Sequence, residues 1–490
     1  MTEEDFNVWL QADDALPLVL VEASVQVAGV ETIRYLANGI YITGPADVPA
    51  NTAYEPIISA PPQIVERLST DGQGSLSAGD IELDNTEGER DGWLMDVWRN
   101  RPLRAWIGDV RWPRADFRLI FDGITADIDS SDRSKLNLKL RDKLQRLNTA
   151  LTEAKLAGAT ENKDALLPVL VGECHNVAPL LADPVTQKYQ LHAGAIERII
   201  EVRDNGKPVP FVGDLAAGKF TLQAQPAGTV TVSAQGDRAA TVYRNTVAKL
   251  IERLATGYGK AADRFSAGDI DAVNFAAFDA AHPQPVGYYA TDRENVLAVC
   301  QYLASSIGAQ LVPSRAGLLR LIALQIPAPG MPIEINESHM VAGSLRPAER
   351  LDVLAAVKVG FCKCWSVQAD LVTSIPTEHK DLYATEWLTE TVTDAATLDR
   401  YRLTAEPEQR DTALLRRVDA RAEAQRELDL RKVQRTVYEF EATAELLMAE
   451  LGAAVRLVSS RYGMAAGVPG MVVSVAPNWL TRRNKIEVLV

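Results

Sequence analysis

The stretch Gly213–Thr221, which reads GDLAAGKFT, could bind the phosphates of a nucleotide. Two glycines with four residues between them, followed by lysine, match most of the phosphate-loop pattern G-x-x-x-x-G-K-[ST]. That loop requires a hydroxyl after the lysine to bind Mg²⁺, and a helix directly behind it whose amide groups bind phosphate. Phe220 occupies the hydroxyl position, and FTLQAQ from Phe220 onward alternates as a strand does. We therefore predict a hairpin connection here and no nucleotide site.

The cysteines are the next candidates for chemistry, because four thiolates are the usual ligands of an iron–sulfur cluster. The sequence contains Cys174, Cys300, Cys362 and Cys364, at spacings that match no standard cluster motif. The segment 355–368 alternates as a strand, which places Cys362 and Cys364 on one face. Two interpretations stay open at this point: a metal cluster, or small buried or interfacial side chains.

The histidines do not support a catalytic site. Cys174 and His175 could act as nucleophile and base, but neighbours in an extended strand point to opposite faces. The five histidines form no H-E-x-x-H or H-x(3–5)-H pair, and the sequence has no G-x-S-x-G elbow. We therefore assign no catalytic, cofactor-binding or metal-binding residue, and we expect no cofactor.

Carboxylates are concentrated in GDIELDNTEGERD, which begins at Gly79. Two of them could serve a glycoside hydrolase, and several could bind calcium, but their order does not follow an EF-hand. The alternation instead predicts a strand with Ile81 and Leu83 inward, leading into a solvated turn. The tryptophans that follow are expected to anchor a core or a subunit contact. They are Trp93, Trp98, Trp106 and Trp112.

The elements that must position these residues are mostly strands in the first half. Phe117–Ile128 and Lys135–Arg141 alternate as half-buried antiparallel strands, and Asp204-Asn205-Gly206 favours a tight hairpin turn. Helical spacing appears from Asn245 and over Val296–Ile307. A long helix is predicted for 407–432, with Pro407 in its first turn and an inward stripe. That stripe consists of Leu414, Leu415, Val418 and Ala422.

The chain length of 490 residues predicts several domains. We predict a β-dominated, multidomain α+β protein, with β modules near both termini, a central β-hairpin domain and an α/β region. The predicted boundaries are 1–160, 166–240, 241–330 and 331–490, with a polar linker over 151–165.

Charge and composition exclude several classes of function. The formal net charge is −14, and residues 1–150 carry 15 basic against 25 acidic residues, a difference of −10. Such a surface repels phosphate backbones, so ordinary nucleic-acid binding is disfavoured. The acidic start lacks the pattern of a signal peptide, and no apolar run approaches 18 residues, so we expect cytoplasmic synthesis without stable membrane insertion. Four cysteines form no disulfide scaffold, which agrees with a reducing compartment.

Several short motifs resemble those of the baseplate hub, or tail-tip, proteins of long-tailed, siphovirus-type bacteriophages. The order of four segments near the N-terminus carries the resemblance: GDIELDN (Gly79–Asn85), WRNRPLRAWIGD (Trp98–Asp109), FDGI (Phe121–Ile124) and KLRD (Lys139–Asp142). Further similar segments are VGECHNVAP (Val171–Pro179), YQLHAG (Tyr189–Gly194), VGFCKCW (Val359–Trp365) and EWL (Glu386–Leu388).

The resemblance implies a structural virion protein that is not an enzyme. Its β modules would be tube-like, within 95–145 and 450–490, and three copies would form a pseudo-sixfold ring that continues the tail tube. The implied partners are two further copies of the chain, a distal tail or tail tube protein, a tip fibre or spike protein, and the tape-measure protein. DNA would pass the ring without specific binding, and the ring would gate DNA ejection. Two alternatives stay open: a tail-associated peptidoglycan hydrolase, with its catalytic domain in 245–330, and a capsid or head–tail connector.

Overall fold

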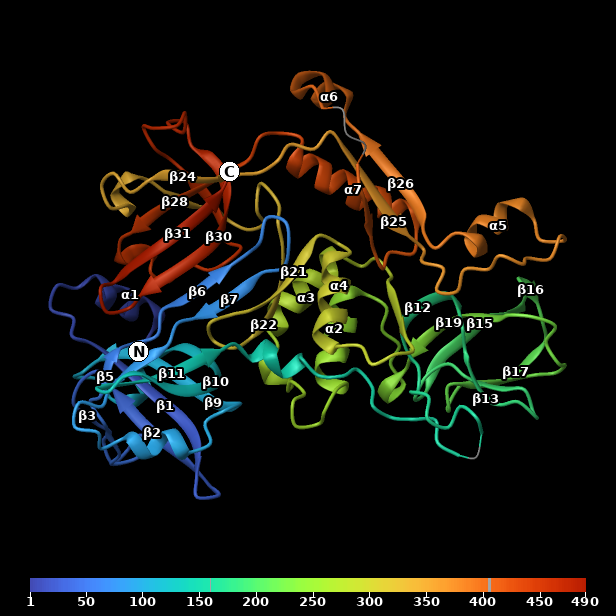
Figure 1. Cartoon of the computed structure of the whole chain (residues 1–490). Coiled ribbons are helices and arrows are strands. Elements are labelled where there is room, and N and C mark those ends of the chain that lie inside the picture. Colours follow the sequence, from blue (N-terminus) through green and yellow to red (C-terminus); the bar gives the residue numbers. More distant parts are fainter. Residues whose placement is uncertain (159, 404–406) are drawn as a thin grey trace. The chain divides into compact units, whose positions relative to one another are not determined.

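The computed structural model describes residues 1–158, 160–403 and 407–490. Strands account for 39% and helices for 19% of the described structure, which confirms the predicted β-dominated α+β class. The chain divides into two compact units, each built from separate stretches of sequence (Figure 1). Unit 1 comprises 1–145, 312–351 and 435–490, and unit 2 comprises 146–311 and 352–434. The four consecutive domains expected from the sequence stay a prediction about smaller modules.

A seven-stranded antiparallel sheet forms the N-terminal part of unit 1, in the order β2-β1-β9-β10-β11-β8-β5. Its strands are β1 (Pro17–Val27), β2 (Val30–Ala37), β5 (Ile58–Ala60), β8 (Ile81–Asp84), β9 (Arg101–Asp109), β10 (Arg118–Asp132) and β11 (Lys135–Arg141). A small pair, β3 (Tyr41–Ile42) and β4 (Ala53–Tyr54), and helix α1 (Glu3–Gln11) accompany the sheet. In this article we call it the N-terminal sheet.

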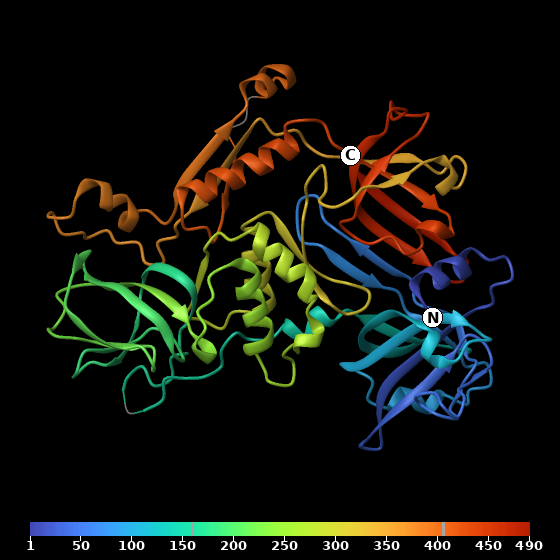
Figure 2. The same ribbon diagram turned by 180° about the vertical axis from the view of Figure 1, so that it is seen from behind.

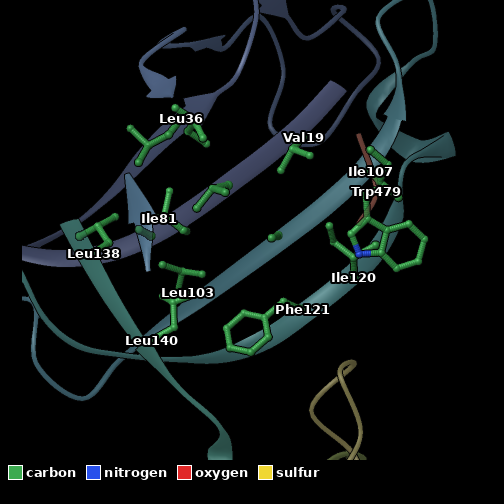
Figure 3. Packing of buried hydrophobic residues seen from close by; sticks show 14 of the residues in the cluster. Val19, Leu36, Ile81, Leu103, Ile107, Ile120, Phe121, Leu138, Leu140 and Trp479 are labelled. Atoms are coloured by element: carbon green, nitrogen blue, oxygen red, sulfur yellow. The ribbon is translucent and has the colours of Figure 1, made fainter. Parts of the chain in front are cut away.

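The N-terminal sheet confirms the alternation expected from the sequence. Ile81 and Leu83 are fully buried, and Leu136, Leu138 and Leu140 of β11 lie in the same core. Figure 3 shows three of them, Ile81, Leu138 and Leu140, near Leu103 of β9. Strand β10 shifts register against both neighbours, at Leu119/Phe121 and at Thr125/Asp127. Such bulges increase local twist and bend the sheet.

A second sheet in unit 1, which we call the C-terminal sheet, has the order β23-β29-β30-β31-β28-β24. The hairpin β6–β7 joins it through β30. The strands are β6 (Ile64–Arg67), β7 (Ser75–Ala78), β23 (Ile333–Ile335), β24 (Arg346–Arg350), β28 (Thr436–Ala442), β29 (Ala454–Leu457), β30 (Val468–Asn478) and β31 (Arg483–Leu489). Strand β22 (Leu319–Ala323) also belongs to unit 1.

One hydrophobic cluster links the two parts of unit 1, while the strands of the C-terminal sheet pack around a second cluster of their own. Leu447 and Trp479, from the C-terminal part, belong to the same buried cluster as the strands of the N-terminal sheet. In Figure 3, Trp479 lies beside Ile107 and Ile120. Residues from the two ends of the chain therefore form a single folded unit.

Unit 2 begins with two small antiparallel sheets that pack around one core. The first has the order β16-β15-β19-β12-β20 and the second the order β13-β14-β18-β17. The strands are β12 (Val169–Val177), β13 (Leu180–Asp183), β14 (Lys188–Gln190), β15 (Ile196–Asp204), β16 (Lys207–Pro208), β17 (Phe211–Asp214), β18 (Lys219–Leu222), β19 (Val230–Asp237) and β20 (Gly287–Ala290). The predicted turn is present, since Asn205 and Gly206 both have positive φ angles.

Three helices follow in unit 2, where the sequence shows helical spacing: α2 (Val247–Gly257), α3 (Ala272–Ala281) and α4 (Val296–Ser305). Helix α2 buries Val247, Leu250, Ile251 and Leu254, as predicted. Strand β21 (Ala309–Pro313) lies at the end of this stretch. No helix within the described residues is long and apolar enough to cross a membrane.

The rest of unit 2 is a three-stranded sheet with adjoining helices (Figure 2). Its strands are β25 (Ala356–Phe361), β26 (Leu388–Thr393) and β27 (Gln409–Asp411), and its helices are α5 (Thr377–Ala384), α6 (Ala395–Tyr401) and α7 (Arg417–Arg431). Strand β25 buries Val357, Val359 and Phe361, as the alternation predicts.

The prediction of one helix over 407–432 is wrong in its start and in its buried face. Residues 409–411 form β27, which pairs in parallel with β25, and helix α7 begins only at Arg417. Pairing with a strand distant in sequence overrides the local helix propensity. Val418 is 68% exposed, whereas the buried residues of α7 are Ala420, Glu423, Ala424 and Leu428. Glu423 is buried because Arg410 and Arg426 form ion pairs with it, at 2.7 and 2.8 Å.

Candidate assembly surfaces and the predicted chemical sites

The stretch Gly213–Thr221, which partly matches a phosphate loop, lies in a β-hairpin. Strands β17 and β18 pair from Phe211↔Leu222 to Asp214↔Lys219, so a strand follows the lysine. The Phe220 side chain is 1% exposed and stacks on Tyr189, with ring centroids 5.1 Å apart. The residue that replaces the magnesium-binding hydroxyl is therefore a core residue, which confirms the predicted hairpin.

The four cysteines are free thiols, and three of them are buried. Burial raises the pKa of each, in the case of Cys362 to about 11, so all four are protonated at neutral pH. A protonated thiol is a poor nucleophile and metal ligand. Within residues 1–158, 160–403 and 407–490, no three His, Cys, Asp or Glu side chains are grouped so that they could hold a metal ion.

The strand predicted through Cys362 and Cys364 is wrong, because β25 ends at Phe361. Cys362 has a φ of +51°, and its amide donates to the Leu414 carbonyl instead of continuing the ladder. The Cys364 amide donates to Glu386. The chain therefore turns away from the sheet at this point, and the two thiols do not share a strand face.

The adjacent Cys174 and His175 point in opposite directions, as expected for neighbours in a strand. Cys174 is 1% exposed within the core, whereas the His175 ring is 30% exposed and lies 3.2 Å from Glu173. Hydrogen bonding to His175 outweighs burial and lowers the pKa of Glu173. The two residues do not form a nucleophile–base pair.

The tryptophans of the N-terminal sheet are anchors, as predicted. Trp93 and Trp98 belong to the core, and the Trp98 indole donates to the Trp93 carbonyl at 2.8 Å. Trp112 packs on Trp9 of α1, with ring centroids 4.5 Å apart. The guanidinium of Arg114 lies 3.9 Å above the Trp106 ring. These contacts are structural.

Asp109 is a buried anchor that the sequence analysis missed. Its carboxylate accepts hydrogen bonds from the Trp9 indole (2.8 Å), the Leu16 amide (2.8 Å) and the Arg111 guanidinium (2.6 Å). Burial opposes its ionisation, but these donors outweigh burial and lower the pKa of Asp109 well below its usual range. Asp109 therefore attaches helix α1 and the entry to β1 to the end of β9.

Open sheet margins and exposed apolar side chains are the features of unit 1 that suit assembly. Strand β2 is the last strand at one end of the N-terminal sheet. Its second half is hydrogen-bonded to Glu55, whereas Val30 and Ile33 in its first half are 66% and 45% exposed. Ile40, Val48 and Met95 are 78%, 88% and 87% exposed. Unpaired strand margins and exposed apolar groups are typical of surfaces that another chain covers.

Unit 1 also contains a polar cleft of about 570 Å³. Its basic side chains are Arg346, Arg483 and Lys485, and its acidic ones are Glu439 and Glu441. Arg346 and Lys485 both pair with Glu439, the latter at 3.1 Å. The pKa of Glu439 is lowered overall. Burial acts to raise it, but the hydrogen bonds that Glu439 accepts from Lys485 and Arg346 have the larger combined effect.

Phage tail and virion proteins are among the solved structures that resemble the chain. The 43 kDa tail protein of prophage MuSo2 from Shewanella oneidensis is 10% identical, with 96% of each chain covered and a TM-score of 0.39. A tail protein from Neisseria meningitidis MC58 is also 10% identical, with 96% of each chain covered and a TM-score of 0.38.

A chain from the virion of a native gene transfer agent particle is 14% identical, covers 71% of this chain and 91% of its own, and has a TM-score of 0.41. No protein-family model matches the sequence, and no curated protein is significantly similar to it. These structural likenesses are too distant to decide a function.

Proposed function

We propose that this protein is a structural component of a phage tail, the baseplate hub at the distal end of the tail tube. The observation that carries the proposal is that unit 1 contains two β modules. Each copy contains two largely antiparallel β modules, one near each end of the chain, that are joined by one hydrophobic cluster. Three copies would therefore supply six modules, the number needed to continue a sixfold tube.

The outer surface of unit 1 supports assembly into such a ring. The N-terminal sheet ends in the half-exposed strand β2, and large apolar side chains are exposed nearby in sequence. In a closed ring each copy would cover the open margin of its neighbour, which removes the risk of uncontrolled edge pairing. Four of the eight segments that resemble tail-tip proteins lie in the N-terminal sheet, where Trp98–Asp109 contains β9 and Lys139–Asp142 ends β11, and the other four lie in unit 2.

The proposed role is mechanical. The hub would bind the tail tube or distal tail protein on one side and the tip fibre or spike on the other. It would hold the end of the tape-measure protein and open when the host is bound. The charge of −10 over residues 1–150 suits a wall past which DNA moves, because it repels the phosphate backbone. Its location would be the tail tip of the virion.

The oligomeric state of the purified chain tests this proposal. One chain has a mass of 53.4 kDa, so three give about 160 kDa (3 × 53.4). Mass photometry is expected to show this trimeric species. A protein that remains monomeric at micromolar concentration, or forms twelvefold or fivefold assemblies, would contradict the hub and favour a connector or capsid role.

The hydrolase alternative is tested separately by a zymogram. A hub is expected to leave peptidoglycan in the gel intact. A cleared band at the mass of the full chain would favour the tail-associated hydrolase instead, with residues 245–330 as the first region to mutate. A known lysozyme in a neighbouring lane shows that the substrate is competent.

A further inference from the structure

We propose that the polar cleft of unit 1 binds an extended, acidic peptide segment of a partner protein. The cleft opens where two strands of the C-terminal sheet separate. Strand β30 pairs with β6 only at Ser474↔Arg67 and Val475↔Glu66. Beyond that point residues 63–65 form one wall of the cleft and residues 476–478 another.

The separation of the strands has a local cause. Pro477 has no amide hydrogen and cannot donate to a ladder. The amide of Ala476 is already taken, because it donates to the Asn484 side-chain carbonyl at 3.0 Å. Strand β30 therefore offers β6 no donor at Ala476 or Pro477. The margin of residues 63–65 that faces the cleft is left without a strand, while β7 covers the other margin of β6.

An extended peptide fits this arrangement better than a compact ligand. A strand margin without a partner binds an added strand through main-chain hydrogen bonds, and flanking side chains then select its sequence. The volume of about 570 Å³ lies within the range of ligand-sized clefts, so it accommodates a short segment and excludes a folded domain.

The side chains select for acidic residues. The cleft has three basic groups against two acidic ones, in a chain whose net charge is −14. Arg346 and Lys485 both form ion pairs with Glu439. Arg483 is exposed and lines the cleft without an ion pair among the described residues. A carboxylate on the incoming segment would pair with Arg483, a charge-assisted contact that favours an acidic peptide over a neutral one.

The test is peptide binding by the full chain at low ionic strength, measured by fluorescence anisotropy. The probe is a fluorescein-labelled peptide of four Glu-Thr repeats, because threonine favours extended structure. The neutral comparison peptide has the same sequence with Gln in place of each Glu. The acidic peptide is expected to bind at least about tenfold more tightly than the neutral one, and Arg483→Glu is expected to weaken it about tenfold.

A matched control distinguishes the cleft from overall charge. Arg133→Glu makes the same charge change at an exposed turn outside the cleft, and it is expected to leave binding unchanged. Hydrogen exchange should show protection of residues 63–65 in the presence of the acidic peptide.

Three outcomes would overturn the inference: equal binding of the two peptides, equal losses in both variants, or protection located elsewhere. None of these outcomes bears on the trimer, whose test is the mass of the assembly. Because Arg483 is exposed, the variant should keep the wild-type circular dichroism; if it does not, Arg483→Gln replaces it in the same comparison.

Discussion

At the scale of single residues, the carboxylate of Asp109 connects distant parts of unit 1. It accepts hydrogen bonds from the nearby Arg111 guanidinium and from the Trp9 indole and the Leu16 amide, which are distant in sequence and could not be identified from the motif WIGD. The sequence does predict that Phe220, Ile81 and Leu83 are core residues, because alternation alone determines which face they occupy. Residues whose role depends on long-range hydrogen bonds carry no such local signal.

The variant Asp109→Asn should destabilise the protein by about 2 to 4 kcal/mol, because it leaves Arg111 and the Trp9 indole poorly paired. Urea unfolding followed by tryptophan fluorescence measures the loss. Asp13→Asn, which changes an exposed acidic residue near the same helix, should shift the midpoint little. Similar midpoints for the two variants would contradict the role assigned to Asp109.

The same carboxylate predicts a dependence of stability on pH. The pKa of Asp109 is lower in the folded than in the unfolded protein, so its contribution is complete above the unfolded value of about 3.9 and is lost as pH falls below it. The difference in unfolding free energy between wild type and Asp109→Asn should therefore be constant from pH 7 to about pH 5 and shrink towards pH 3. A difference that grows on acidification would contradict the assignment.

At the scale of elements, periodicity predicted the type of most strands and helices but not where tertiary contacts end them. Strands β8, β11 and β18 and helix α2 follow their patterns. Residues 409–411 form a strand that pairs in parallel with β25. Strand β25 ends before Cys362, whose amide donates to the Leu414 carbonyl. Both failures occur where a partner distant in sequence provides the hydrogen bonds.

One element depends on an unusually close approach of two backbones. In the β12–β20 pair, Gly172 lies opposite Gly287, and a Cβ on Gly287 would lie 1.9 Å from the Glu173 carbonyl oxygen. Gly287→Ala should therefore destabilise unit 2 by at least about 2 kcal/mol, measured by thermal unfolding. Gly92→Ala is the matched control, because nothing lies within 4 Å of its added Cβ. Equal melting temperatures for the two variants would contradict this prediction, because they would show that β12 and β20 can move apart without loss of stability.

At the scale of the whole molecule, the sequence predicts β modules near both ends of the chain but not that they belong to one unit. Composition and periodicity are local properties, whereas the shared core of unit 1 joins residues as distant as Val19 and Trp479. The segments of the two units alternate along the chain, and neither residue spacing nor charge predicts this order. The proposed ring requires both modules in one unit, and this arrangement can be derived from the structure but not from the sequence.

The position of the protein in the virion tests the central proposal most directly. Electron microscopy of intact particles that carry a small C-terminal tag on this chain, decorated with a tag-specific antibody fragment, locates it. We predict label at the distal tip of the tail, with three copies around the tube axis. Label on the head, along the shaft, or absent from the particle would contradict the hub.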